Sequence, residues 1–246
     1  MRATDLNQAL NYVDDVYLLE ADIPDKEIKT MKNKKRTFRI LVAAAMISLL
    51  SVTAYAAEVL HIRSLENGRS EHFETYSDMD RAVAKVGLDT DIPEKFENGF
   101  RFQGGEVQEV EAKDDNGDLV LTYQELCVYY ENESGKKIIL CAGANLEELP
   151  KRDDVPDESK AVGEVQLNYY LDHYKFVPED YKLSEAEEAW AQQPGNYVSY
   201  GSDEVEEKET AFLTWTENGM YYFFMDTNPG DSEILFDMAE EMICKQ

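Results

Sequence analysis

The sequence is poor in the residue types that most often carry enzyme chemistry or bind a metal. It has three cysteines and three histidines. No histidine pairs with another histidine or with a cysteine at the spacing of a metal site. It also lacks a phosphate loop, a dinucleotide fingerprint, a Gly-x-Ser-x-Gly elbow and a zinc-protease helix. We therefore expect a non-enzymatic protein with no catalytic residue, cofactor or metal.

Positive charge is scarce in the larger part of the chain. Sixteen basic and forty-four acidic residues follow residue 57. A surface this acidic repels nucleic acid and anionic lipid headgroups, so we expect no nucleic-acid partner. Fifteen tyrosines, ten phenylalanines and two tryptophans supply the material of a core, which argues against a disordered acidic tail.

One segment, Ile40 to Ala57, lacks charge altogether. Its eighteen residues are followed at once by Glu58. As a helix it would be roughly 27 Å long, close to the roughly 30 Å of a bilayer's hydrocarbon core. A cationic cluster precedes it, formed by Lys32, Lys34, Lys35, Arg36 and Arg39. Cationic residues stay in the cytoplasm, so we predict a single transmembrane helix at 37–58, an inside segment at 1–36 and an outside domain at 59–246.

A cleaved signal peptide is the alternative to this anchor. Ala54-Tyr55-Ala56 has the form of a signal-peptidase site. The preceding region is long for a signal peptide and contains seven acidic residues. The anchor is therefore the preferred interpretation, and both remain open.

The inside segment contains the pattern of an amphipathic helix at 5–20. Asp5, with Gln8 three residues on, resembles a capping box. The apolar stripe recurs at helical spacing and consists of Leu6, Leu10, Val13 and Tyr17. One short helix cannot bury its own stripe, so we predict that these side chains bind a cytoplasmic partner. A helix on the membrane surface, or one that frays, is the alternative.

The outer domain is predicted to be α+β, an antiparallel sheet of hairpins with a few packed helices. We expect helices at 77–86, capped by Ser77 and ended by Gly87, at 184–192 with a capping box, and near the C-terminus after Asp231 or Ser232. Asn116-Gly117 and Asn218-Gly219 predict type I′ hairpin turns. Strands are expected at 105–113, 118–131, 136–142, 163–176, 196–206, 209–216 and 220–226.

Two arrangements of this domain remain open. Residues 147–160 have the composition of a linker, and Ile92-Pro93-Glu94 is similar to Val177-Pro178-Glu179. These features suggest two similar halves, 75–146 and 161–246. One continuous sheet with helices on one face is equally consistent with the pattern.

Two cysteines flank a predicted turn symmetrically. Cys127 and Cys141 each lie seven residues from Ser134. In a hairpin of that register they face each other, and an oxidising exterior allows a disulfide. Two buried thiols are the alternative. Cys244 is expected to be unpaired.

Several of these patterns together resemble a known family. They are the run from Ala9 to Tyr17, the basic cluster before one span, and a C-terminal part with Leu213-Thr214-Trp215 and Asp237-Met238-Ala239-Glu240. The chain resembles single-pass, anti-sigma-factor-like membrane proteins of Gram-positive anaerobes, whose outer domains are mostly of unknown function. The resemblance implies a regulator whose inside helix binds a sigma factor and whose outer domain senses an envelope ligand. An outer binding module whose N-terminal part is only an anchor is the alternative.

Overall fold

The computed structural model describes residues 62–114, 116–145, 152 and 154–244. Among these residues, no helix has the length and apolar character needed to cross a bilayer. The predicted span at 37–58 and the docking stripe of Leu6, Leu10, Val13 and Tyr17 lie outside the described residues.

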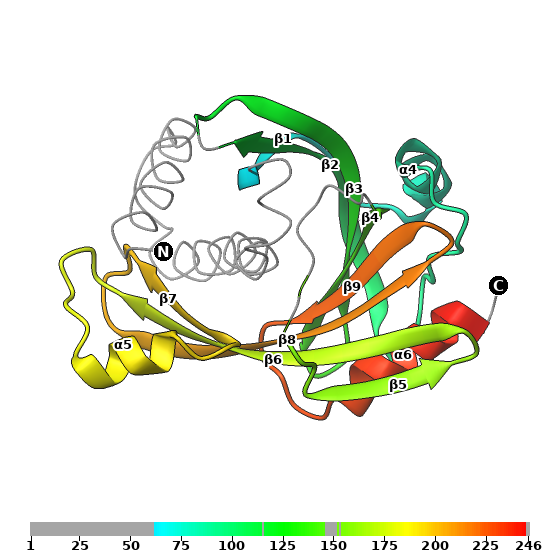
Figure 1. The fold of residues 1–246 in the computed structure, drawn as a ribbon. Helices are drawn as coiled ribbons and strands as arrows, with labels where there is room; N and C mark the ends of the chain where they lie inside the picture. The colour runs from blue at the N-terminus through cyan, green and yellow to red at the C-terminus, as the bar shows by residue number, and fades with distance from the viewer. Residues whose placement is uncertain (1–61, 115, 146–151, 153, 245–246) are drawn as a thin grey trace, which may run out of the picture.

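The described chain forms one nine-stranded sheet with helices, so the α+β prediction is confirmed (Figure 1). The strand order is β1-β2-β3-β4-β9-β8-β6-β5, and β7 pairs with β6 beside this path. The strands are β1 (Ile62–Phe73), β2 (Arg101–Asp114), β3 (Leu119–Glu131), β4 (Lys137–Ala144), β5 (Glu158–Val162), β6 (Val165–Val177), β7 (Asn196–Tyr200), β8 (Glu206–Glu217) and β9 (Met220–Asp226). The helices are η1 (Tyr76–Asp78), α4 (Met79–Val86), α5 (Glu185–Ala191) and α6 (Glu233–Cys244).

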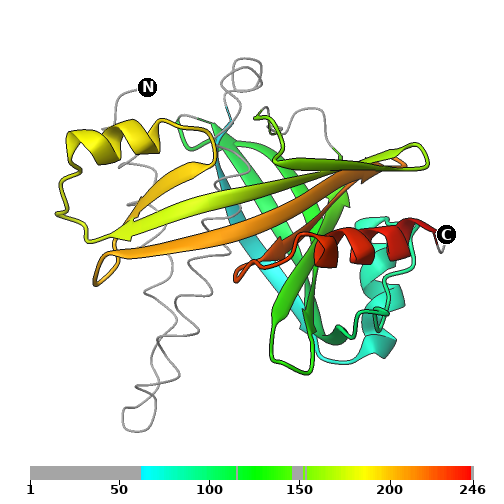
Figure 2. The same ribbon diagram turned by 90° about the horizontal axis from the view of Figure 1, so that it is seen from below.

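The sequence predicts an antiparallel sheet, but one pair of strands in the structure is parallel. β7 runs parallel to β6, from the pair His173–Asn196 to the pair Val177–Tyr200. A parallel neighbour requires a crossover instead of a tight turn, and α5 lies in that connection (Figure 2). The predicted capping box of α5 is present, because Ser184 and Glu187 exchange side-chain-to-backbone hydrogen bonds.

The segment predicted as a linker is partly built into the sheet. Its last three residues, 158–160, begin the edge strand β5 (Glu158–Val162). Arg152, which precedes β5, forms ion pairs with Asp154 and Asp172 and has a side chain only 5% exposed. The linker prediction was wrong for these residues, since a composition rich in charge does not distinguish a free segment from a polar edge strand.

The two predicted type I′ turns had different outcomes. Asn218 and Gly219 both have positive φ, of 50° and 75°, which confirms the second turn. At the first, only Gly117 has positive φ, and the side chain of Asp114 accepts hydrogen bonds from the backbone of Asn116 and Asp118. Asp114 therefore organises a longer loop through these two hydrogen bonds.

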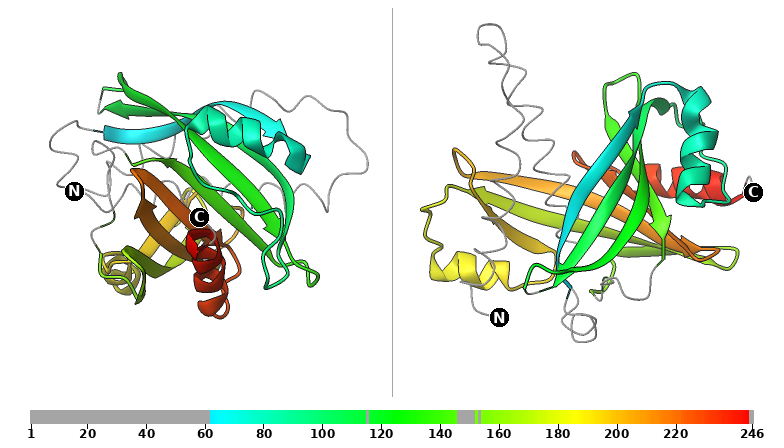
Figure 3. Two further views of the ribbon diagram at one scale, coloured as in Figure 1. Left: turned by 90° about the vertical axis from the view of Figure 1, so that its right-hand side faces the viewer. Right: turned by 90° about the horizontal axis from the view of Figure 1, so that it is seen from above.

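The main core lies between the sheet and the helices α4 and α6, on the side of the sheet that we call the first face (Figure 3). Strand residues Leu126, Val128 and Leu140 pack there with Met79 of α4 and Met238 of α6. The aromatic residues Phe96, Phe100, Trp215, Tyr222 and Phe224 are at most 3% exposed in this core. Burial of such side chains contributes roughly 1.5–3 kcal/mol each, so this face supplies most of the apolar stabilisation.

α4 confirms most of what its sequence predicts. Gly87 ends it in the left-handed region with φ 78°, and Met79 and Ala82 are buried. Ser77 is not its N-cap, because it lies inside η1, and Asp78 precedes the first helical residue without a side-chain capping bond. A short 3-10 turn thus takes the place of the expected cap.

The two hairpins β3–β4 and β8–β9 lie side by side in one sheet. They meet where β4 pairs antiparallel with β9, from Ile139–Met225 to Ala144–Met220. The similar tripeptides do not follow equivalent elements, since Ile92-Pro93-Glu94 comes after α4 and Val177-Pro178-Glu179 begins at the end of β6. The duplication of 75–146 and 161–246 stays a prediction.

Candidate functional site

The opposite side of the sheet, which we call the second face, combines apolar and reactive side chains. None of the described helices contributes a residue to its central cluster. Successive side chains of a strand point to opposite faces of the sheet. The strand residues on this face are therefore the ones that alternate with the residues of the main core. The buried members of the cluster are Cys127, Ile139, Cys141, Phe212, Phe223 and Met225.

Cys127 and Cys141 form a disulfide in the structure. They are direct partners in the β3–β4 register, and their Cα atoms are 4.3 Å apart. Both are nearly buried, with 3% and 4% of their surface exposed. The hairpin geometry expected from the sequence thus brings the two residues together, whereas Cys244 is free and exposed.

A buried carboxyl group lies beside this disulfide. Glu125 is two residues before Cys127 on β3 and is only 8% exposed. Its Oε2 accepts a hydrogen bond of 2.8 Å from Gln108 Nε2 and lies 3.6 Å from Cys127 Sγ. Gln108 Nε2 also lies 3.3 Å from Cys127 Sγ. One amide group therefore links the carboxyl group to one of the two sulfur atoms.

Burial changes the acidity of Glu125. Loss of solvation raises its pKa to about 7, the hydrogen bond from Gln108 opposes the rise, and the charge of Glu106 adds to it. Glu106 itself accepts a short hydrogen bond from Tyr129 and lies 3.2 Å from His72 Nδ1. Glu125 therefore exchanges its proton near neutral pH, where an ordinary glutamate is fully ionised.

The same residues have the donor atoms of a small metal site. Within the described residues, Glu125, Cys127 and Cys141 are the group whose ligand atoms all lie within 4.8 Å of one another. Thiolates and a carboxylate suit zinc, but a metal needs the sulfurs as thiolates. In the disulfide they are bonded to each other, so the oxidised site does not fit a metal.

A second polar group also lies on the second face and involves β6. Arg152 Nη2 is 2.7 Å from Asp172 Oδ1, and the guanidinium lies 4.0 Å from the centre of the Tyr170 ring. Asp172 is 0% exposed, and burial raises its pKa while Arg152 opposes the rise. These charges satisfy one another, so the pair holds the segment before β5 against β6 and has no spare group for chemistry.

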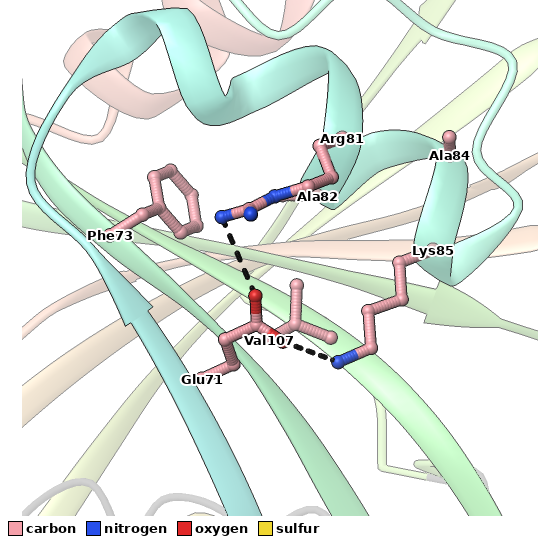
Figure 4. Close-up of a pocket in the computed structure, with 7 residues that line it drawn as sticks. All are labelled: Glu71, Phe73, Arg81, Ala82, Ala84, Lys85 and Val107. Atoms are coloured by element: carbon pink, nitrogen blue, oxygen red, sulfur yellow. Dashed lines mark hydrogen bonds and ion pairs between the residues drawn. The ribbon is translucent and has the colours of Figure 1, made fainter.

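A pocket of about 380 Å³ lies beside α4 (Figure 4). Figure 4 shows Arg81 and Lys85 reaching from α4 toward Glu71 of β1, and Phe73 and Val107 also line the pocket. Glu71 pairs with Lys85 at 2.9 Å and with Arg81 at 3.4 Å. The pocket's charges are thus already paired with each other, and they are largely exposed to solvent.

The sequence predicts the cysteine pair, whereas the roles of Glu125 and Gln108 were not predicted from it. A signal for Glu125 was present, since Gln124-Glu125 interrupts the otherwise apolar second half of a predicted strand. A charged residue at a position that the strand period assigns to a buried face indicates a functional or paired group. No family model, curated protein or solved structure matches the chain, so the site is interpreted from its own geometry.

Proposed function

We propose that the chain is a membrane-anchored, non-enzymatic regulator of the anti-sigma-like kind. In this proposal residues 1–36 bind a cytoplasmic sigma factor, residues 37–58 span the cell membrane, and the domain at 59–246 senses a condition of the envelope. The cationic cluster before Ile40 supports the orientation, because such clusters stay in the cytoplasm.

The observation that carries the proposal is the Cys127–Cys141 disulfide. Disulfides persist outside the cytoplasm and are rare within it, where thiols are kept reduced. The charge pattern around residues 40–57 assigns the same domain to the outside, by an independent physical argument. A folded domain outside and a short apolar stripe inside, joined by one span, is an arrangement suited to passing a signal across a membrane.

The inside stripe gives the proposal its sharpest test. An aspartate in place of Leu10 or Val13 puts a charge into the apolar face and should abolish partner binding, because an unpaired charge in an apolar interface costs several kcal/mol. Asn11→Asp is the matched control, since it adds the same charge off the stripe. The measurement is recovery of the sigma factor with the tagged full-length chain from detergent-solubilised membranes.

Two results would contradict this proposal. One is that the unaltered chain recovers no sigma factor or other cytoplasmic partner. The other is that Leu10→Asp and Asn11→Asp behave alike, because the stripe would then not be the binding surface.

A second candidate function is an outer binding module that uses the N-terminal part only as an anchor. The pocket between α4 and β1 favours it, because Phe73 and Val107 offer an apolar wall beside the charged groups of Arg81 and Lys85. A ligand bound only by the folded state raises thermal stability, by about 2.7 kcal/mol at one hundred times its dissociation constant. Thermal shifts of the full chain against calcium, magnesium and cell-wall fragments test this, with Arg81→Ala expected to remove any shift due to the pocket.

A further inference from the structure

We propose that Cys127–Cys141 is a redox-active disulfide that exchanges with a thiol reductant, and that Glu125 delivers a proton to the Cys127 sulfur as it leaves. The substrate class is a small or protein dithiol. This inference deepens the proposed function, on which it rests for its biological meaning, because it makes the thiol balance of the envelope the condition sensed.

The surroundings of the two sulfur atoms are unequal. Cys127 Sγ has Gln108 Nε2 at 3.3 Å and Glu125 Oε2 at 3.6 Å. Among the described residues, no side-chain hydrogen bond is found at Cys141 Sγ; its strand neighbours on this face are Ile139 and, across the β4–β9 pair, Phe223. A negative charge that develops on a sulfur atom is stabilised by a nearby N–H donor and by protonation. The geometry therefore assigns Cys127 as the leaving sulfur and Cys141 as the sulfur that is attacked.

The reduction of the disulfide takes place in two successive exchange steps. A thiolate of the reductant attacks Cys141 Sγ, a mixed disulfide forms, and the electron pair of the Sγ–Sγ bond goes to Cys127 Sγ, which takes the proton of Glu125. The second thiol of the reductant gives its proton to the Glu125 carboxylate and attacks the reductant's own sulfur in the mixed disulfide. Cys141 then leaves and takes a proton from water. The disulfide gains two electrons and two protons, and the dithiol becomes a cyclic disulfide.

A proton donor matters at this place because the leaving sulfur is buried. A thiolate next to an ionised Glu125 would put two negative charges into one poorly solvated site. Burial holds the pKa of Glu125 at about 7, so the donor is available at and below neutral pH. The other titratable groups around it are Glu106 from β2, which is paired with His72 from β1, Tyr123 and Tyr129 from β3, and Tyr221 from β9.

The pH dependence of reduction tests the role of Glu125. The full-length chain in detergent is reduced with dithiothreitol between pH 6 and pH 8, and the rate is divided by the concentration of reductant thiolate. For the unaltered chain this corrected rate should fall about tenfold over that range, as Glu125 loses its proton. In Glu125→Gln it should change less than about twofold, since an amide has no proton to deliver.

The matched control is Glu131→Gln. Glu131 lies on the same strand and face as Glu125, six residues on and therefore about 20 Å away. It should keep the pH profile of the unaltered chain. A profile that is flat in the unaltered chain, or one that Glu125→Gln leaves unchanged, would overturn the role of Glu125.

A second measurement needs no variant and so does not depend on one that folds poorly. The unaltered chain is treated with a monothiol, quenched with acid and digested, and mass spectrometry locates the mixed disulfide. The adduct should lie on Cys141. An adduct mainly on Cys127, or a bond that dithiothreitol leaves intact without denaturant, would contradict the proposal. Neither result bears on the binding of a sigma factor by residues 1–36. The redox proposal can therefore be rejected while the proposed function stands, and the reverse is also true.

Discussion

The two faces of the central sheet differ in what they bury. The first face packs apolar side chains of β3, β4, β8 and β9 against α4 and α6. The second face buries a disulfide and a carboxyl group on β3 and β4 and an amide group on β2, among aromatic side chains, and no described helix contributes to its central cluster. Along each strand the two sets alternate residue by residue. The comparison indicates that one face is built for stability and that the other carries the groups with chemistry.

Truncation on the first face should have the largest effect on stability. Phe224 is 0% exposed, and its ring lies 6.0 Å from that of Phe96 and 5.6 Å from that of Trp215. Phe224→Ala should lower the free energy of unfolding by about 3–5 kcal/mol, through lost burial and the cavity left behind. Denaturant titration of the full chain, followed by circular dichroism, measures it.

An exposed apolar side chain in the same sheet is the control for this truncation. Leu119, at the start of β3, is 57% exposed, so Leu119→Ala should change the free energy of unfolding by less than about 0.5 kcal/mol. If Phe224→Ala and Leu119→Ala lowered the free energy of unfolding equally, the first face would not be the main source of stability.

On the second face, the ionisation of Glu125 should lower the free energy of unfolding by a smaller amount, and this loss should depend on pH. Glu125 has a folded-state pKa of about 7 against an ordinary 4.5, so the folded state binds the proton more tightly. The free energy of unfolding should therefore fall as pH rises from about 4.5 to about 7 and then level off, by about 3 kcal/mol in all. Glu125→Gln should match the unaltered chain near pH 5 and exceed it by up to that amount at pH 8.

Denaturant titrations of both chains at pH 5, 6, 7 and 8 measure this difference. Phe224→Ala provides the contrast, because its loss of stability comes from packing and should be similar at every pH. A difference between Glu125→Gln and the unaltered chain that does not grow with pH would show that Glu125 is not held in a poorly solvated site.

How much of the fold the sequence predicts depends on the position of each strand in the sheet. The central strands β3, β4, β8 and β9 were predicted because their apolar residues are buried on both faces or alternate clearly. The edge strands β1 and β5 were missed. Glu158–Val162 is almost wholly exposed, so an edge strand of this kind lacks the apolar period on which strand prediction depends.

The candidate site was predictable only in part, for a similar reason. The spacing of Cys127 and Cys141 about one turn was enough to predict their pairing across a hairpin, because register follows from the turn. Glu125 and Gln108 come from different strands, and only the β2–β3 register places them opposite each other. Without that register, the strand period marks Glu125 as a charged residue at a buried position but does not identify Gln108 as its partner.

The oxidation state of the three cysteines in the membrane tests the central claim most directly. The claim is that residues 59–246 lie outside and that their second face carries a disulfide. Membranes are dissolved in denaturant without reductant, the free thiols are alkylated, and the chain is weighed by mass spectrometry. The account predicts one alkylated residue, Cys244, with Cys127 and Cys141 joined. Three alkylated cysteines would contradict the disulfide and remove the main support for the outside location.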